Sequence, residues 1–314
     1  MLKIAPVYAI WLACVATASN VVVSKLATPY VTSAVFLFFA CAIAYLCFCF
    51  VLPQEERLRL FDKDVRGKAL GMGTFGTALP MTIFMVALNY TTPVNSAIDN
   101  QFEIIYSLIL SAIILKERPT LKQIGGSMLV LAGVILIVIK GGTYVQAKGD
   151  FMILSSLWLF QLSHIFAKKL PADLSPRQIA AARAFYAMPA LAVLIFALRL
   201  IQGPLLFSGV PTAWGSLGNS YYIVFPHGAL MLWGTLLFSA LINYFIGNTF
   251  WYTAIRNMDL SKATAIILSY PVFTYLFSAL VGEDDFTLYK IIGMILAVGG
   301  AYIVTATVKK GDVK

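Results

Sequence analysis

The sequence predicts an all-α integral membrane protein with ten transmembrane helices, arranged as two inverted five-helix repeats. Three observations lead to this fold class: the composition, a series of apolar runs, and similar short motifs in the two halves of the chain. The 314 residues are 60% hydrophobic and only 12% charged, whereas a soluble domain carries roughly 25% charged residues. Lipid is therefore the expected solvent for most of the chain.

Ten apolar runs are long enough to cross a bilayer, whose hydrocarbon core of about 30 Å takes about 20 residues of helix. The first run begins by Ile4 and a second follows at once, so no cleavable signal is expected. Pro93, the last residue of the short break TTP at 91–93, suits the first turn of a new helix. The predicted spans are approximately 4–24, 30–52, 69–90, 92–115, 121–140, 149–168, 176–199, 227–255, 260–281 and 287–307.

Lys and Arg are distributed unequally between the two sides of these spans. The side that holds both termini carries 16 of them and the opposite side carries 5, with Arg183 and Lys262 left inside spans. The positive-inside rule therefore predicts cytoplasmic N- and C-termini in the cell (inner) membrane. The net charge of +9 is explained as an orientation signal, aided by anionic lipid, and no nucleic-acid partner is expected.

The longest external connection, 200–226, contains Trp214, Tyr221 and Tyr222. Such residues suit either anchoring at the headgroup level, which is the preferred interpretation, or a lid over an external opening.

The two halves, residues 1–145 and 146–314, contain similar motifs in the same order. SNVVVSKL (19–26) matches SHIFAKKL (163–170), and FLFFA (36–40) matches RAFYA (183–187). LKERPTLKQIGG parallels VGEDDFTLYKIIG. The final glycines of these motifs, Gly126 and Gly293, are each followed seven residues later by another glycine, Gly133 and Gly300. Because each half has five spans, the second copy begins on the opposite face of the membrane, which predicts an inverted repeat of the kind found in secondary transporters.

These motifs resemble the drug/metabolite transporter superfamily, specifically its EamA-type ten-helix members, and the resemblance covers essentially the whole chain. It rests on Ser19-Asn20 followed by Lys25, on Arg183, on Pro271 in SYPVFTYLFSALVGE, and on the acidic turn before each glycine helix. It implies a 5+5 bundle around a central cavity lined mainly by spans 1, 3, 4, 6, 8 and 9, and alternating access. It does not imply a substrate.

The first repeat departs from the second at two positions: Phe36 stands where the second copy has Arg183, and Ile105 where it has Pro271. The region around Ile105 is acidic, whereas 263–271 is nearly apolar. The polar face of the fourth span is therefore not required by the repeat, and it is the main candidate for a substrate site.

This face lies in NSAIDNQFEIIYS (95–107). At 3.6 residues per turn Asn95, Asp99, Glu103 and, slightly turned, Tyr106 share one side of a helix, with Asn100 beside it. Two carboxylates at that depth are accommodated if one holds a proton or if a cation lies between them. The first solution predicts proton coupling through Glu103 or Asp99. The second predicts a cationic or amino-bearing substrate. A structural bridge to Arg183 or Lys262 is the alternative.

Further translocation candidates lie on other spans, each with a packing explanation beside the functional one. His164 and Trp158 share a stripe of the sixth span, and Asn20 is the repeat mate of His164. Asn243 lies in the eighth span, where interhelical hydrogen bonding is common. The face of the Tyr270 ring would attract a cation. Arg183 would bind a substrate carboxylate or snorkel to the interface, and with Lys262 it supports the alternative of an anionic or phosphorylated substrate.

The four cysteines all lie in apolar runs and none has metal-ligand spacing with a histidine, so neither metal, cofactor nor disulfide is expected. An intramembrane lipid-acting enzyme is disfavoured because HExxH and GxSxG motifs are absent. A scaffold or channel is disfavoured by the acidic midplane residues. The prediction is a monomeric secondary active transporter of a small polar metabolite, such as an amino acid or amine, and not an enzyme.

Overall fold

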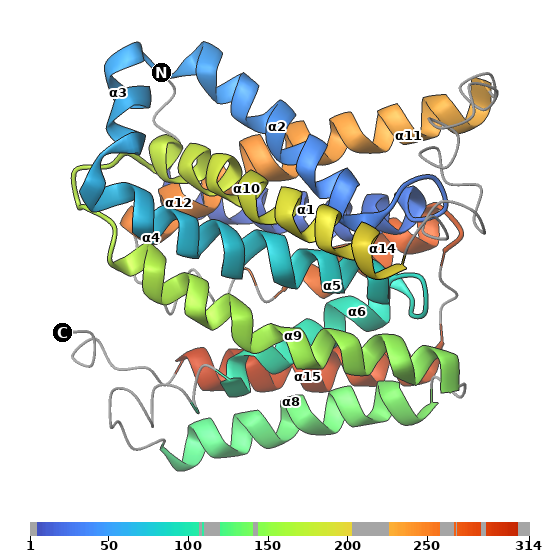
Figure 1. Cartoon of the computed structure of the whole chain (residues 1–314). Helices are drawn as coiled ribbons and strands as arrows, with labels where there is room; N and C mark the ends of the chain where they lie inside the picture. The colour runs from blue at the N-terminus through green and yellow to red at the C-terminus, as the bar shows by residue number, and fades with distance from the viewer. Residues whose placement is uncertain are drawn as a thin grey trace. The chain divides into compact units, whose positions relative to one another are not determined.

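The fold is known from a computed structural model that describes residues 5–106, 109, 120–140, 144–202, 226–257, 267, 269–283 and 287–306. Across these ranges the regular structure is helical (Figure 1). The main helices are α1 (Pro6–Ala27), α2 (Ser33–Val51), α4 (Lys63–Gly73), α5 (Leu79–Ala87), α6 (Pro93–Asp99), α8 (Leu121–Lys140), α9 (Tyr144–Lys168), α10 (Pro176–Gln202), α11 (Pro226–Phe238), α12 (Asn248–Asn257), α14 (Tyr270–Leu280) and α15 (Leu288–Ala306). A short helix α3 (Gln54–Leu58) and the 3₁₀ turn η1 (Arg59–Phe61) join α2 to α4.

Five helical stretches of the described chain are long and apolar enough to cross a membrane: Pro6–Ala27, Ser33–Val51, Lys63–Ala87, Pro176–Leu198 and Leu230–Asn257. Shorter apolar helices cover Leu121–Leu136, Tyr270–Leu280 and Leu288–Ile303. Their outward side chains are apolar, as those of Phe50, Val193 and Leu280 illustrate. Exposed aliphatic and aromatic groups of this kind are expected of helices surrounded by lipid.

Two of these stretches are interrupted by π-helical segments. One is η2 (Thr74–Ala78), between α4 and α5, and the other is η5 (Ser239–Gly247), between α11 and α12. They belong to the third and eighth predicted spans, which are repeat mates. Segments of π-helix are rare and concentrate at functional sites.

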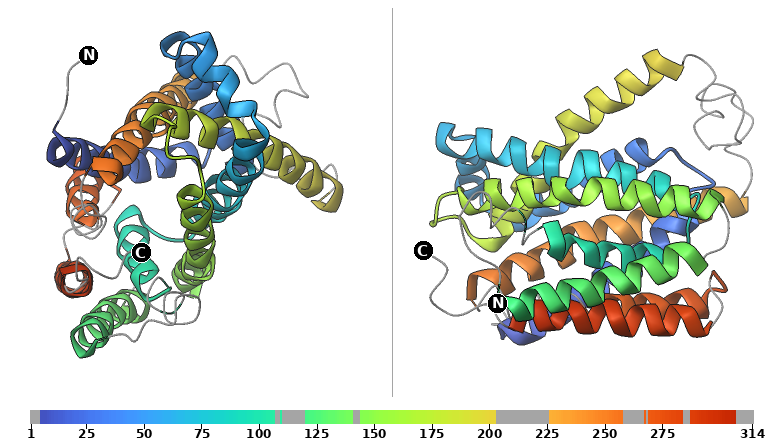
Figure 2. Two further views of the ribbon diagram at one scale, coloured as in Figure 1. Left: turned by 90° about the vertical axis from the view of Figure 1, so that its left-hand side faces the viewer. Right: turned by 90° about the horizontal axis from the view of Figure 1, so that it is seen from below.

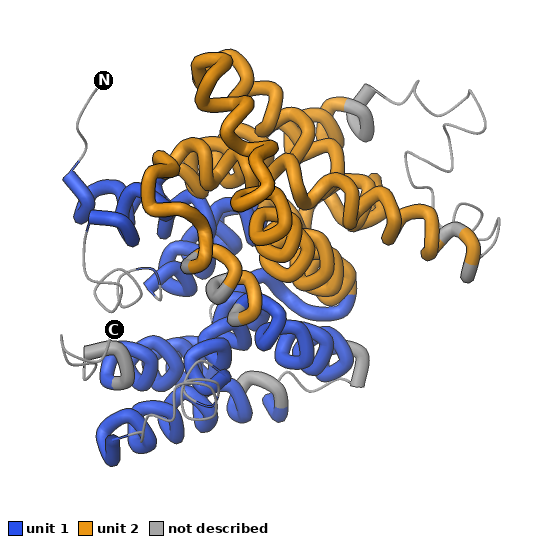
Figure 3. The backbone as a smooth tube through the Cα atoms, turned by 60° about the vertical axis from the view of Figure 1, so that its left-hand side comes forward, with its two compact units in different colours: residues 1–22, 90–161, 250–314 blue, residues 23–89, 162–249 orange. Residues whose placement is uncertain are grey.

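The chain forms two compact units, and each contains segments from both halves of the sequence (Figure 3). Unit 1 comprises residues 1–22, 90–161 and 250–314. Unit 2 comprises residues 23–89 and 162–249. The chain passes from one unit to the other within α1, α9 and α12, so these helices contribute residues to both.

In unit 1, α8 and α15 lie side by side along their length (Figures 1 and 2). A Cβ atom added to Gly133 would lie 2.6 Å from the carbonyl oxygen of Gly293, and one added to Gly300 would lie 2.5 Å from that of Gly126. The predicted glycine pairs therefore meet each other within one chain, because only glycine permits such close backbone approach. The register, Gly126 with Gly300 and Gly133 with Gly293, shows that the two helices are antiparallel.

In unit 2, α2, α10, α11 and the π-helical segment η5 build an apolar core. Phe36, Leu37, Cys41 and Leu191 are almost fully buried in it. The helix α4 packs on α10 with similar closeness, since a Cβ on Gly73 would lie 2.5 Å from the backbone nitrogen of Ala187.

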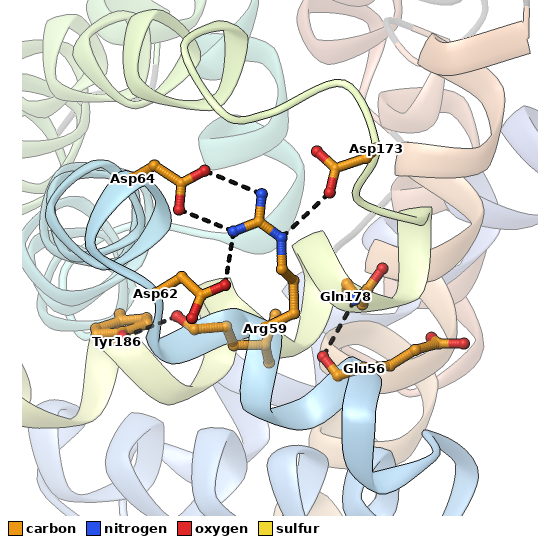
Figure 4. A network of polar contacts seen from close by, with 8 residues as sticks. Glu56, Arg59, Asp62, Asp64, Asp173, Gln178 and Tyr186 are labelled. Atoms are coloured by element: carbon orange, nitrogen blue, oxygen red, sulfur yellow. Dashed lines mark hydrogen bonds and ion pairs between the residues drawn. The ribbon is translucent and has the colours of Figure 1, made fainter.

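A cluster of charged residues joins two connections at one end of unit 2 (Figure 4). The guanidinium of Arg59 donates hydrogen bonds to Asp62 at 2.8 Å, to Asp64 at 2.8 and 2.9 Å, and to Asp173 at 3.1 Å. Asp173 lies between α9 and α10, so the cluster links the α2–α4 connection to the α9–α10 connection. The bonds to the three aspartates raise the pKa of Arg59, and the bond from Arg59 lowers the pKa of Asp173.

Candidate functional site

The acidic stretch of the fourth predicted span begins with α6. Thr92 caps this helix by accepting a hydrogen bond from the backbone N–H of Asn95, and Pro93 occupies the first turn as predicted. All seven residues of α6 are buried. The chain then tightens into the 3₁₀ turn η3 (Asn100–Phe102) and returns to helix at Glu103. The regular 3.6-residue spacing that would align Asp99 with Glu103 is therefore interrupted between them.

The structure brings Asp99 together with a second carboxyl group, that of Asp150 in the second turn of α9. Both residues are 0% exposed, and their carboxyl groups lie within electrostatic range of each other. Thr91, the residue before the α6 cap, donates a hydrogen bond from its hydroxyl to Asp150 Oδ1. A carboxyl pair is thus built in unit 1 from segments of the two sequence halves.

The carboxyl pair and the nearby Asn95 contain buried polar atoms that have no hydrogen-bond partner among the described residues. They are both oxygens of Asp99, Asp150 Oδ2, and the amide oxygen and nitrogen of Asn95, which is also 0% exposed. Asn95 lies four residues before Asp99 and therefore on the same face of α6. Buried polar groups are almost always hydrogen-bonded in folded proteins, so this group of orphan atoms is a strong indication of a site that takes a polar ligand.

Tyr270, at the start of α14, contacts the end of α6 and the 3₁₀ turn that follows it. Its hydroxyl donates a hydrogen bond to the carbonyl oxygen of Ala97 at 3.1 Å. It also interacts with Asn100 and lies within electrostatic range of Asp99 and Glu103. Glu103 is half-buried, and Tyr106 is half-buried against Phe102 with ring centroids 5.5 Å apart. Of the predicted site residues, Asn95, Asp99, Asn100 and Glu103 from the polar face and Tyr270 from the ninth predicted span thus lie close together in unit 1.

Lys148, the basic residue closest in sequence to Asp150, is engaged elsewhere. Its ammonium nitrogen lies over the ring of Tyr90, 4.3 Å from the centroid, in a cation–π contact. Lys148 is two residues from Asp150, so it projects from a different side of α9.

Arg183 forms its hydrogen bonds within unit 2. Its guanidinium donates to Thr77 Oγ1 at 2.9 Å and to the carbonyl oxygen of Gly76. Both acceptors belong to the π-helical segment η2, so Arg183 acts here as a support for that segment. Its predicted role in binding a substrate carboxylate stays a prediction.

The remaining predicted residues are less informative. Asn20 is buried and its side-chain oxygen has no partner in the described chain, whereas Trp158 is 44% exposed. Asn243 is half-buried in η5 of unit 2. The side chain of His164 lies outside the described residues, as do Lys262 and most of the predicted external connection 200–226.

Two residues of the site, Asp150 and Thr91, were not predicted. Asp150 carries a usable signal, because it is an ionisable residue inside the predicted span 149–168, and intramembrane ionisable residues are functional by default. Its position one residue from the start of that span made it resemble an interfacial charge. Thr91 has no signal of its own, since its role depends on a contact 59 residues away.

The chain has clear similarity to known transporters. The profile of the EamA-like transporter family matches residues 5–139 and again 147–306. An "uncharacterized transporter YyaM" of Bacillus subtilis is 26% identical over 232 residues, which are 72% of this chain and 69% of that protein. An "uncharacterized transporter" of Archaeoglobus fulgidus is 24% identical over 264 residues, 84% of this chain and 85% of that protein.

One solved structure, titled "Crystal structure of protein", has the same fold. It superposes with a TM-score of 0.56 at 14% identity, covering 98% of this chain and all of its own. With apolar helices of membrane-spanning length and two matches that together cover nearly the whole sequence, the chain belongs to the EamA-like transporter family of the drug/metabolite transporter superfamily, and it is an integral membrane protein.

Proposed function

We propose that this protein is a secondary active transporter of a small polar metabolite that carries an amino group or another cation, such as an amino acid or amine. The observation that carries the proposal is Asp99, which is fully buried and has no partner for either carboxylate oxygen in the described chain. A buried carboxylate is expensive unless a cation or hydrogen-bond donors reach it. A substrate ammonium group supplies both.

The surroundings of Asp99 suit such a ligand. The amide of Asn95 offers one acceptor and two donors on the same face, so it can bind the polar remainder of an amino-bearing compound. The carboxyl group of Glu103 and the ring of Tyr270 lie at the next turn, and both attract a cation.

An anionic or phosphorylated substrate is less consistent with the described residues. Arg183 or Lys262 would have to bind it. The guanidinium of Arg183 is already hydrogen-bonded to Thr77 and Gly76, and Lys262 lies outside the described residues. The described residues around Asp99 are acidic, and they would repel an anion.

We infer alternating access between two inverted repeats as the mode of transport. The antiparallel pairing of α8 with α15 supports the inversion, because these helices are repeat mates and meet reciprocally at their matched glycines. A pseudo-two-fold axis in the membrane plane has this effect on equivalent helices. The paired π-helical segments η2 and η5 support it further, since both interrupt equivalent spans.

The substrate class is tested by binding and transport on purified protein. Ligands that bind the native state raise its thermal stability, and the effect grows as the ligand concentration exceeds the dissociation constant. A panel of amines and amino acids should therefore stabilise the protein, while phosphorylated sugars and dicarboxylates should not. In reconstituted vesicles the stabilising compounds should be transported, and Asp99→Asn and Glu103→Gln should each abolish or strongly weaken that transport.

Glu55→Gln is the matched control, because it makes the same chemical change on an exposed carboxyl group outside the site. Melting temperatures separate function from structure: lost transport with an unchanged melt supports the proposal. Stabilisation by anions alone, or full transport by Asp99→Asn, would contradict it.

In the proposed orientation the protein lies in the cell membrane, and both termini are in the cytoplasm. A membrane-impermeant thiol reagent added from outside should then label a cysteine engineered into residues 202–220 and miss one at 56–66. The reverse pattern would overturn the orientation.

A further inference from the structure

Asp99 and Asp150 form an arrangement that is unfavourable if both carboxyl groups are ionised. Both side chains are completely buried, and they lie within electrostatic range of each other. Two adjacent buried anions repel each other and also lose their hydration, so one of them is expected to take up a proton or a cation.

Among the described residues, the other charged and titratable groups on the neighbouring elements are arranged as follows. From α9, Lys148 lies over Tyr90. From α14 and the turn after η3, Tyr270 and Glu103 add acceptors or negative charge. On α8, Lys122 and Lys140 are exposed, and on α15 Lys290 is buried in the first turn. The charged group that interacts with Asp99 is Asp150 itself.

One proton accounts for the orphan atoms of the pair better than a second anion does. Asp99 Oδ1, Asp99 Oδ2 and Asp150 Oδ2 have no donor among the described residues. A proton on Asp99 turns one of its oxygens into a donor that can reach the Asp150 carboxylate, so a single hydrogen bond satisfies one orphan atom on each residue.

The hydrogen bond from Thr91 decides which carboxyl group keeps the proton. Its hydroxyl donates to Asp150 Oδ1, and a donated hydrogen bond favours the ionised form of a carboxyl group. Asp99 receives no such bond in the described chain. The proton therefore resides on Asp99, and Asp150 is the anion that accepts its hydrogen bond.

We propose that Asp99 and Asp150, with Thr91 as donor, form a proton-binding site in unit 1 that holds one exchangeable proton and couples transport to the proton gradient. This inference rests on the proposed function for its role in transport, and it adds Asp150 and Thr91 to the working residues. Asp99 is neutral while it holds the proton, and it becomes the carboxylate that binds the substrate cation once the proton is released. In one cycle the pair takes one proton from water on one side of the membrane and releases it to water on the other, returning to its starting state.

Infrared spectroscopy of the purified protein in lipid tests the site without knowledge of the substrate. A protonated carboxyl group gives a C=O stretch that is separate from the carboxylate and amide bands and that shifts in D₂O. At neutral pH the wild type should show this band, and Asp99→Asn should lose it. Asp150→Asn should keep the band but shift its frequency, because the carboxylate that accepts the hydrogen bond becomes an amide.

Glu103→Gln is the matched control, since it removes the other carboxyl group of the same span and should leave the Asp99 component unchanged. Should Asp99→Asn fail to fold, the shift in Asp150→Asn still decides the question. The proposal is overturned if the wild type has no protonated carboxyl at neutral pH, if Asp150→Asn leaves the band unshifted, or if Glu103→Gln removes it. Loss of the band when sodium replaces choline in the buffer would also overturn it, in favour of a metal-cation site.

The two proposals can fail separately. An Asp99 band without transport of any amino-bearing compound would contradict the proposed substrate class and leave the proton site standing. Transport of such a compound by a protein that lacks the band would refute the proton site alone.

Discussion

Alanine substitutions at neighbouring glycines of α8 and α15 should have opposite effects on stability. Gly133 and Gly300 lie in the contact between the helices, where an added Cβ would be 2.6 and 2.5 Å from an opposing backbone oxygen. Gly125 and Gly299 lie on the same two helices, and an added Cβ there meets nothing within 4 Å. The two pairs share helix, residue type and substitution, and differ in the space available.

The expected magnitudes follow from that difference. Replacing a helical glycine by alanine in open space removes unfolded-state freedom and should stabilise by about 0.5–1 kcal/mol. At Gly133 and Gly300 the helices must separate to relieve the overlap, and overpacking of this kind costs about 1–3 kcal/mol. The net effect at the contact is a loss of up to about 2 kcal/mol, which changes the unfolding equilibrium by a factor of up to about 30.

Thermal unfolding of the purified variants measures this contrast. Gly125→Ala and Gly299→Ala should melt at or slightly above the wild-type temperature, and Gly133→Ala and Gly300→Ala several degrees below it. The double variant at Gly133 and Gly300 should lose less than the sum of the two single losses, because a separation forced by one methyl group also makes room for the other. If Gly300→Ala is as stable as Gly299→Ala, the close contact of α8 with α15 is wrong.

Three further outcomes are expected. Arg183→Lys should destabilise the protein, because one ammonium group cannot reproduce the planar donors to Thr77 and Gly76; an unchanged melt would refute its support of η2. Asp173→Asn should weaken the cluster around Arg59 near neutral pH but not in acid. The lowered pKa of Asp173 means that its contribution is present above the unfolded-state pKa and is lost as pH falls through the folded-state value. Wild-type and variant melting curves that differ equally at acidic and neutral pH would contradict this. Tyr270→Phe removes the buried donor to Ala97 and should lower the stability by about 1–3 kcal/mol, measurable as a lower melting temperature than that of the exposed-site control Tyr302→Phe.

The all-helical membrane class, the presence of two repeats and the family could be predicted from the sequence because they depend on patterns along the chain. Apolar runs reveal membrane-spanning helices, and the order of short motifs reveals the repeat. The matched glycines are typical of close helix packing, but the pairing of α8 with α15 was not predicted. The ends of the spans were predicted less accurately: the third predicted span, 69–90, begins earlier, as α4 at Lys63.

Only the part of the carboxyl site that α6 contributes was predicted from the sequence. Asn95 and Asp99 share a helical face whatever the tertiary structure is, so periodicity found them. Regular α-helical spacing places Glu103 beside Asp99, four residues further on, but the 3₁₀ turn η3 interrupts that regularity. Asp150 meets Asp99 across 51 residues of sequence, and Arg183 meets Thr77 across 106. Periodicity carries no information on contacts of that length.

The interleaving of the two units has a consequence for how the protein is made. Gly133 and its partner Gly293 are 160 residues apart, so at about 5–20 residues per second the ribosome needs about 10–30 s to supply the second after the first. During that interval α8 is in the membrane with its glycine face uncovered, and unit 1 also lacks α14 and α15. Unit 2 is in the same position, because α2 and α4 wait for α10. The nascent chain therefore depends on the insertion machinery or on lipid to cover these faces until its last helices emerge.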